Sequence, residues 1–202
     1  MIPLAKSLNC DGRNGRALLC LVAFLLALGL FAGWGRAHLS YDRAHLLQGE
    51  HWRWITGHLV HLDLAHAALN AIGLTLTWAL YRAMWSAAQW LVILLASVLA
   101  IDVGLWFLQP QVEWYVGASG VLHGCIAAGL VAQARSERLI AAVVGTLLAA
   151  KLAWEAAYGA LPFSGEGHDV VLSAHRYGAF GGAAAALVLM AIITRFAKLV
   201  RS

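Results

Sequence analysis

Six apolar runs with few charged side chains constrain this chain more than any other feature. A helix needs about 20 apolar residues to cross about 30 Å of hydrocarbon. Over the whole chain 61% of the residues are hydrophobic and 12% are charged, a balance far from that of soluble domains. We therefore predict an all-α polytopic membrane protein, a bundle of six transmembrane helices. The runs are residues 17–35, 64–80, 87–108, 119–134, 139–161 and 170–194.

The first run, residues 17–35, has two interpretations. A signal peptide and a first membrane helix would both follow basic residues such as Arg13 and Arg16. The run is longer than the apolar core of a typical signal peptide, and Phe-Ala-Gly-Trp at its end is a poor cleavage site. We therefore favour an uncleaved first helix.

Residues 36–63, between the first two runs, are polar but rich in aromatic side chains. This segment contains Trp52, Trp54 and five histidines. It is too polar to span a bilayer, and aromatic residues of this kind are typical of membrane interfaces. We predict an interfacial loop within a single membrane domain that covers residues 1–202.

The basic residues indicate how the predicted helices are oriented. Loops on the cytoplasmic side of a membrane carry an excess of Lys and Arg. Most of the Lys and Arg residues lie at alternate ends of the runs. This pattern places both termini, including residues 1–16, in the cytoplasm. Residues 36–63, 109–118 and 162–169 then lie on the opposite side. Basic residues at the ends of apolar runs do not form the stripe expected of a nucleic-acid surface. The residues on the cytoplasmic side are Lys6, Arg13, Arg16, Arg82, Arg135, Arg138, Arg195, Lys198 and Arg201.

The three cysteines, Cys10, Cys20 and Cys125, are scattered along the chain. An odd number cannot pair completely within one chain. We predict neither a disulfide framework nor a thiolate metal site.

The fourth run is short for a membrane span and begins at Ser119, between Gly117 and Gly120. A helix that begins below the surface leaves irregular backbone inside the membrane, which is tolerated next to protein or a water-filled cavity. The first N–H groups of a helix have no partner within it, so they can stabilise an oxyanion beside a serine hydroxyl. The alternative is a small-residue face that packs against another helix.

A histidine in the sixth run is a candidate general base. His175 lies three residues before Gly178, which is four residues before Gly182, so the three share one helix face. Two glycines on that face allow another helix to approach closely. If that helix begins at Ser119, the imidazole can reach the hydroxyl. The alternative is an interfacial histidine without a catalytic role.

His66 and Asn70 lie one helical turn apart on the second run. Each side chain offers a hydrogen-bond donor to a developing negative charge. Hydrogen bonding between helices is the alternative role.

Three ionisable residues in the third and fifth runs fall outside these groups. Lys151 and Glu155 are four residues apart and can neutralise each other, so we predict a structural ion pair. Asp102 lies near the outer end of its run, where we expect it to reach interfacial water, and we assign it no catalytic role.

Taken together, the Gly-x-Ser-Gly motif at Ser119, the Ala-His-x-x-Gly-x-x-x-Gly motif at His175 and the His-x-x-x-Asn motif at His66 resemble those of rhomboid proteases. The resemblance covers residues 46–197. It implies an intramembrane serine endopeptidase that cleaves membrane-anchored proteins, with Ser119 as nucleophile and His175 as general base. It further implies that His66 and Asn70 donate to the oxyanion, and that Gly178 and Gly182 pack the last helix against the serine helix. We expect no metal and no other cofactor.

Within that family the Leu122-His123-Gly124 motif and the compact chain look like the rhombosortase branch. Many other rhomboids carry tyrosine at the position of His123, beneath the ring of the base. The branch implies a bacterial inner-membrane enzyme whose active site faces the periplasm. Its implied substrates end in a Gly-Gly motif, a transmembrane helix and a basic tail.

Two other functions remain open from the sequence. His58, His61 and His66 lie within nine residues, and three imidazoles could bind zinc or copper in a membrane metalloprotein. A non-catalytic rhomboid-like binding protein is the second alternative, although such proteins normally lack the serine or the histidine that this chain retains.

Overall fold

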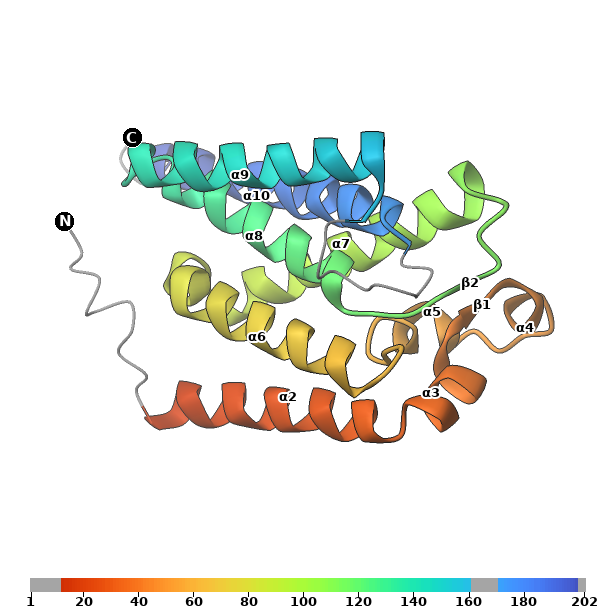
Figure 1. Ribbon diagram of the computed structural model, residues 1–202. Helices are drawn as coiled ribbons and strands as arrows, with labels where there is room; N and C mark the ends of the chain where they lie inside the picture. Colours follow the sequence, from red (N-terminus) through yellow and green to blue (C-terminus); the bar gives the residue numbers. More distant parts are fainter. Residues whose placement is uncertain (1–11, 161–170, 200–202) are drawn as a thin grey trace.

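The computed structural model describes residues 12–160 and 171–199, which fold mainly into helices (Figure 1). The short helix α8 (Ser119–Gln133), which corresponds to the fourth apolar run, contacts α6, α7, α9 and α10. At 15 residues it is about 22 Å long, less than the thickness of the hydrocarbon. The remaining elements, in order, are α2 (Gly12–Leu30), α3 (Ala32–Leu39), β1 (Tyr41–Asp42), α4 (Arg43–Leu47), α5 (Arg53–Thr56), α6 (Leu64–Tyr81), η1 (Arg82–Met84), α7 (Ala87–Val103), η2 (Gly104–Leu108), β2 (Trp114–Tyr115), α9 (Arg138–Tyr158) and α10 (Ser173–Leu199).

Four helices of the described part are long and apolar enough to cross a membrane, or five if a bent pair counts as one span. The four are Leu64–Met84, Ala87–Leu108, Arg138–Tyr158 and Ser173–Phe196. Large apolar side chains are exposed along these helices, which would be costly in water. The chain is therefore a multi-pass membrane protein.

The single helix predicted over residues 17–35 is wrong in one respect. α2 ends at Leu30, and α3 leaves it at an angle of 91°. Gly33 and Gly35 weaken a helix in this region, and Gly35 is buried close to Val60. The bend thus places α3 next to Val60, in the segment that precedes α6, instead of extending α2.

The remaining helix ends lie near the predicted ones. Asp63 and Ser86 cap α6 and α7 through hydrogen bonds from backbone N–H groups. α9 ends before Gly159, whose φ of +87° suits glycine. The predicted cytoplasmic segment 1–16 is described only from residue 12, and the whole of the predicted outer loop 162–169 lies outside the described residues.

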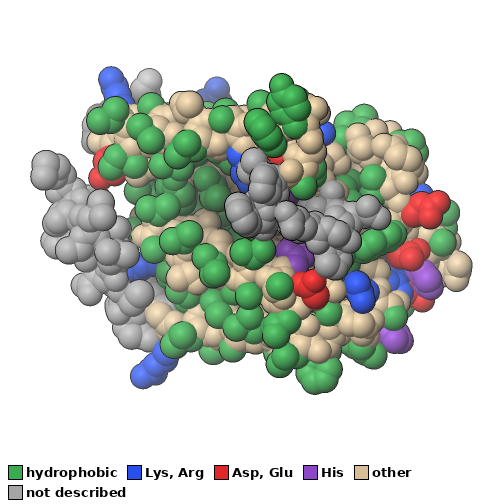
Figure 2. Space-filling view, in the orientation of Figure 1, with side chains coloured by type: hydrophobic (Ala, Val, Ile, Leu, Met, Phe, Trp, Pro, Cys, Tyr) green, Lys and Arg blue, Asp and Glu red, His purple; other side chains and the backbone are tan. Residues whose placement is uncertain are grey.

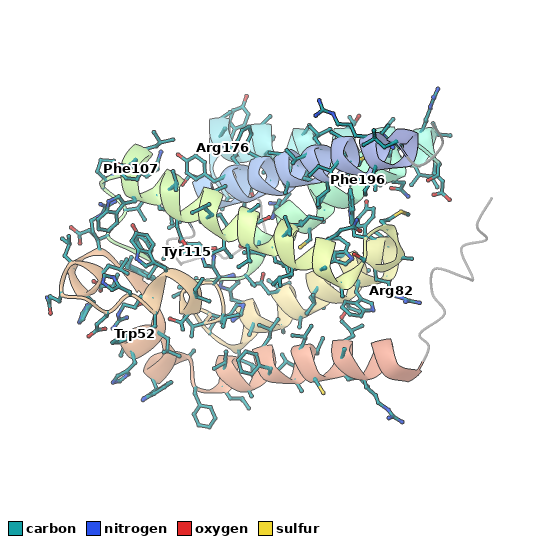
Figure 3. The ribbon with its side chains drawn as sticks, turned by 180° about the vertical axis from the view of Figure 1, so that it is seen from behind. Trp52, Arg82, Phe107, Tyr115, Arg176 and Phe196 are labelled. Atoms are coloured by element: carbon teal, nitrogen blue, oxygen red, sulfur yellow. The ribbon has the colours of Figure 1, made fainter. Side chains whose placement is uncertain are left out.

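The bundle has two chemically different ends. Arg82 and Phe196 lie at one end, and Trp52 and Phe107 lie at the other (Figure 3). α2 begins and α10 ends at the same end of the bundle (Figure 1). Hydrophobic side chains are spread over the face drawn in Figure 2, whereas acidic side chains and histidines gather beside α4.

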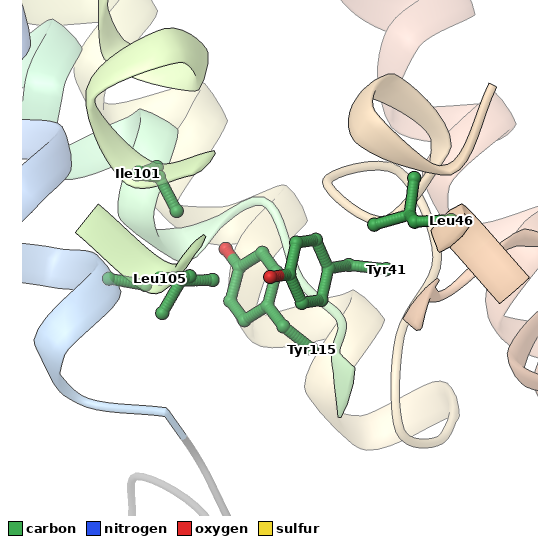
Figure 4. Packing of buried hydrophobic residues seen from close by; sticks show 6 residues of the cluster. Tyr41, Leu46, Ile101, Leu105 and Tyr115 are labelled. Atoms are coloured by element: carbon green, nitrogen blue, oxygen red, sulfur yellow. The ribbon is translucent and has the colours of Figure 1, made fainter. Parts of the chain in front are cut away.

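The segment between α2 and α6 forms a compact structure at the end of the bundle where Trp52 and Phe107 lie. β1 pairs with β2 in antiparallel register and so joins this segment to the loop before α8. Arg53 is buried, and its guanidinium donates to the carbonyl oxygens of Ser40 and Ala37 and to Glu50. An apolar cluster joins the segment to α7 and α10 (Figure 4): Tyr41, Leu46, Ile101, Leu105, Tyr115 and Ala174.

α8 and α10 form the most extensive helix contact of the described part. A Cβ atom added to Gly178 would overlap the carbonyl of Gly120, and one added to Gly182 would overlap the backbone of Gly124. Small residues let the two backbones touch, which is the usual way helices associate in membranes. The axis of α10 is thereby fixed against the beginning of α8.

We predict that Gly182→Ala destabilises the protein, because the added methyl group would meet the backbone of Gly124 and not a movable side chain. Such overpacking typically costs about 1–3 kcal/mol. Thermal unfolding in detergent, followed by circular dichroism, measures the effect.

Gly145→Ala in α9 is the matched control, since the nearest atom to its added Cβ is 4.0 Å away. This substitution should be neutral or slightly stabilising, because alanine favours helix more than glycine does. Equal melting temperatures for both variants would contradict the close contact of α8 and α10.

Candidate active site

A loop that only glycine can complete places Ser119 at the first position of α8. Gly117 has a φ of +125°, and its N–H donates to the carbonyl of Gly57 at 3.0 Å. The Tyr115 hydroxyl donates to the carbonyl of Gly117 at 2.5 Å. Burial and the nearby Asp102 carboxylate raise the pKa of Tyr115, so the phenol stays protonated and keeps this bond.

The beginning of α8 has N–H groups without helical partners. Ala118 is the N-cap residue and makes no side-chain cap, so α8 directs its positive end toward the side chain of Ser119. A negative charge that develops beside the Ser119 hydroxyl is stabilised there.

His175 and Ser119 are brought together by the contact of α10 with α8. The distance between His175 Nε2 and Ser119 Oγ is 2.9 Å, although 56 residues separate them in the chain. The imidazole is 4% exposed. A serine hydroxyl this close to an imidazole nitrogen can lose its proton to the ring when it attacks an electrophile.

The second nitrogen of this imidazole has a partner that the sequence did not predict. His175 Nδ1 lies 2.9 Å from Glu155 Oε2 on α9. Glu155 Oε1 accepts a hydrogen bond from Lys151, so the predicted ion pair is present. A carboxylate within an apolar run was the sequence signal for this contact. It was not used, because the four-residue spacing to Lys151 already explained the presence of Glu155.

His123 packs against His175 from within α8. Its ring stacks on that of His175, with centroids 4.3 Å apart and planes 14° apart. His123 Nδ1 donates to the carbonyl of Ser119 at 2.7 Å, one helical turn earlier. Since this nitrogen is occupied, the ring's evident contribution is to hold the imidazole of His175 in its plane.

His66 lies beside the loop at Gly117, and its Cε1 atom is 3.0 Å from the position of a Cβ on that glycine. The Leu62 N–H donates to His66 Nδ1 at 3.5 Å, which favours a proton on Nε2. Asn70 is buried, and its amide donates to the carbonyl of His66 at 3.0 Å. This bond uses one of two amide hydrogens.

The alternative metal site of the sequence analysis also included His58 and His61, and the ring of His61 packs against that of His66 with centroids 5.2 Å apart. His58 Nε2 lies 3.1 Å from Asp102 Oδ1, and Asp102 is buried, so the expectation that it reaches interfacial water is wrong. Burial and the neighbouring His66 lower the pKa of His61 to about 4, which keeps its imidazole neutral at physiological pH. Within residues 12–160 and 171–199 no three His, Cys, Asp or Glu side chains form a group that could hold a metal ion.

Comparisons with known proteins agree with the predicted family. The rhomboid domain matches residues 48–192. The rhomboid protease GluP of Bacillus subtilis (strain 168) is 29% identical over 105 residues, which are 52% of this chain and 20% of GluP. The putative rhomboid protease YdcA of the same organism is 26% identical over 134 residues, which are 66% of this chain and 65% of YdcA.

The chain thus spans less than two thirds of the length of either relative. No solved structure matches it significantly. The rhomboid match covers well over half of the chain and coincides with the helices that carry Ser119 and His175. The chain therefore belongs to the rhomboid family.

Proposed function

We propose that this protein is an intramembrane serine endopeptidase in which Ser119 is the nucleophile and His175 the general base. The 2.9 Å contact between Ser119 Oγ and His175 Nε2 carries the proposal. A hydroxyl and an imidazole in contact at the beginning of a helix combine a nucleophile, its base and a positive electrostatic environment. A non-catalytic binding protein would have no need of this arrangement.

The proposed reaction begins with attack of Ser119 Oγ on the carbonyl carbon of a substrate peptide bond. As the new bond forms, the hydroxyl proton passes to His175 Nε2. The carbonyl oxygen becomes an oxyanion, to which the Ser119 N–H, His66 and Asn70 donate hydrogen bonds. The imidazolium then protonates the leaving amine. In the second half of the reaction water attacks the acyl-enzyme and gives its proton to His175, which returns it to Ser119 Oγ as the acid product leaves.

The proposed topology has six spans, formed by α2, α6, α7, α8, α9 and α10. The helix ends and turns on one side of the bundle carry five arginines: Arg16, Arg82, Arg135, Arg138 and Arg195. The excess of basic residues there supports a cytoplasmic location for that side and for both termini. The interfacial segment and Ser119 would then face the periplasm of a bacterial inner membrane.

The proposed substrates are membrane-anchored proteins, and the rhombosortase resemblance suggests those with a Gly-Gly motif, a transmembrane helix and a basic tail. A cavity of about 720 Å³ reaches Ala118 and Leu122, on either side of Ser119 in the chain, and is lined mainly by apolar side chains. Such a lining suits an apolar substrate segment more than a polar peptide.

We predict that Ser119→Ala and His175→Ala each abolish cleavage of a membrane-anchored reporter with a Gly-Gly tail. Each substitution should lower kcat by about 10⁴-fold or more, and the double variant should lose little further activity because both residues act at one step. Cleavage is measured with purified protein in detergent or liposomes. Undiminished cleavage by Ser119→Ala would refute the protease function.

Fluorophosphonate labelling provides an independent test of the nucleophile. The reagent should label Ser119 in the intact protein and label His175→Ala far more slowly, since an isolated hydroxyl is a weak nucleophile. Cys125→Ser is the control, because it removes a buried free thiol on the same helix. This variant should be labelled as the intact protein is. Equal labelling of the intact protein and Ser119→Ala would place the nucleophile elsewhere.

We predict that His66→Ala and Asn70→Ala lower kcat less than Ser119→Ala does. One oxyanion donor typically contributes about 2.7–4 kcal/mol, or 10²–10³-fold in kcat, while the other donors remain. Initial rates on the same reporter measure the effect. Wild-type rates in both variants would contradict their assignment to the oxyanion.

A further inference from the structure

Glu155 is a carboxylate inside an apolar bundle with both of its oxygens hydrogen-bonded. Its side chain is fully buried, which is costly for a charge without partners. Oε2 lies 2.9 Å from His175 Nδ1, and Oε1 accepts from Lys151. Lys151 is itself 29% exposed, so the ion pair extends from the bundle interior toward its surface.

These contacts determine which nitrogen of His175 carries the proton. An ionised carboxylate can only accept hydrogen bonds, so Nδ1 must donate to Glu155. In the neutral ring Nε2 then has a lone pair, which faces the Ser119 hydroxyl at 2.9 Å. This tautomer is the one that a general base for Ser119 needs.

We propose that Glu155 is a positioning residue that makes the Ser119–His175 pair into a hydroxyl–imidazole–carboxylate triad; the inference rests on the proposed protease function. When the Oγ–H bond of Ser119 breaks and its proton moves to Nε2, His175 becomes positively charged. The carboxylate stabilises that charge through Nδ1–H and holds the ring orientation. Glu155 neither gains nor loses a proton, and the proton on Nε2 passes to the leaving amine.

Lys151 has a supporting part in this arrangement. A carboxylate with a single neutral partner in an apolar interior would favour its protonated form. The ammonium group of Lys151 compensates the negative charge and fixes one carboxylate oxygen, so the other oxygen is directed at His175. The ring of His175 is then held by Ser119 at Nε2, by Glu155 at Nδ1 and by His123 on one face.

A purely structural role is the alternative, because α9 buries only Ala141 and Glu155 along its length. In that case Glu155 would serve as a tether between α9 and α10. A glutamine has the same shape, and its amide oxygen can still accept from Nδ1–H. Glu155→Gln therefore preserves a tether but removes the charge that the forming imidazolium needs.

The test compares kcat and KM for the membrane-anchored reporter, together with the rate of fluorophosphonate labelling. Glu155→Gln should lower kcat and the labelling rate by at least about tenfold, with KM within about twofold of wild type, because the charge acts after substrate binds. Glu155→Asp retains the carboxylate and should be faster than Glu155→Gln. In the His175→Ala background, Glu155→Gln should cause no further loss.

Glu137→Gln is the matched control, since Glu137 also accepts a side-chain hydrogen bond but lies at the opposite end of α9. It should leave kcat and labelling unchanged. Glu155→Gln at wild-type kcat, or at or above the kcat of Glu155→Asp, would overturn the inference while Ser119→Ala remained inactive. Activity in Ser119→Ala would instead refute the underlying protease function.

Discussion

The direct contact of two helix backbones, α8 and α10, is the constraint on which the site depends. Gly120 and Gly124 on α8 meet Gly178 and Gly182 on α10, with no room for a side chain between them. Lipid tails offer helices little hydrophobic reason to associate, so close backbone packing has to hold them. The same contact brings Ser119 and His175, on the facing surfaces just before these glycines, to hydrogen-bond distance.

The loop before α8 needs its own support, because the polar groups of buried backbone outside helices and strands have to be hydrogen-bonded by the protein. The Tyr115 hydroxyl and the Gly57 carbonyl hydrogen-bond to Gly117, and the β1–β2 pair joins the loop to the interfacial segment. Arg43 secures the other side by donating to the carbonyls of Leu105 and Trp106 while lying over the Trp106 ring. Residues 36–63 are therefore polar and aromatic because they hydrogen-bond and cover the buried backbone of this loop.

Sequence alone predicted the helices where local signals determine their ends. α6 and α7 begin at the predicted residues because Asp63 and Ser86 are N-caps, and such signals are local. The bend after Leu30 was missed because no residue within the apolar run marks it, and the contact of Gly35 with the distant Val60 is visible only in the folded chain. Glu155 was predicted as a partner of Lys151 because their spacing on one helix is enough to pair them. Its contact with His175 depends on how α9 lies against α10, which no pattern within either helix reveals.

The three members of the proposed triad are consequently held by different means. The hydroxyl and the imidazole sit on two helices whose backbones touch, so their separation can change little without disrupting the bundle. The carboxylate sits on α9, which buries little of its own surface, and its alignment depends on hydrogen bonds to His175 and Lys151. A shift of about 1 Å between reacting groups can cost about a hundredfold in rate. The glycine contact would therefore set whether the base reaches the serine, whereas the position of α9 would set how well the charged form of that base is stabilised.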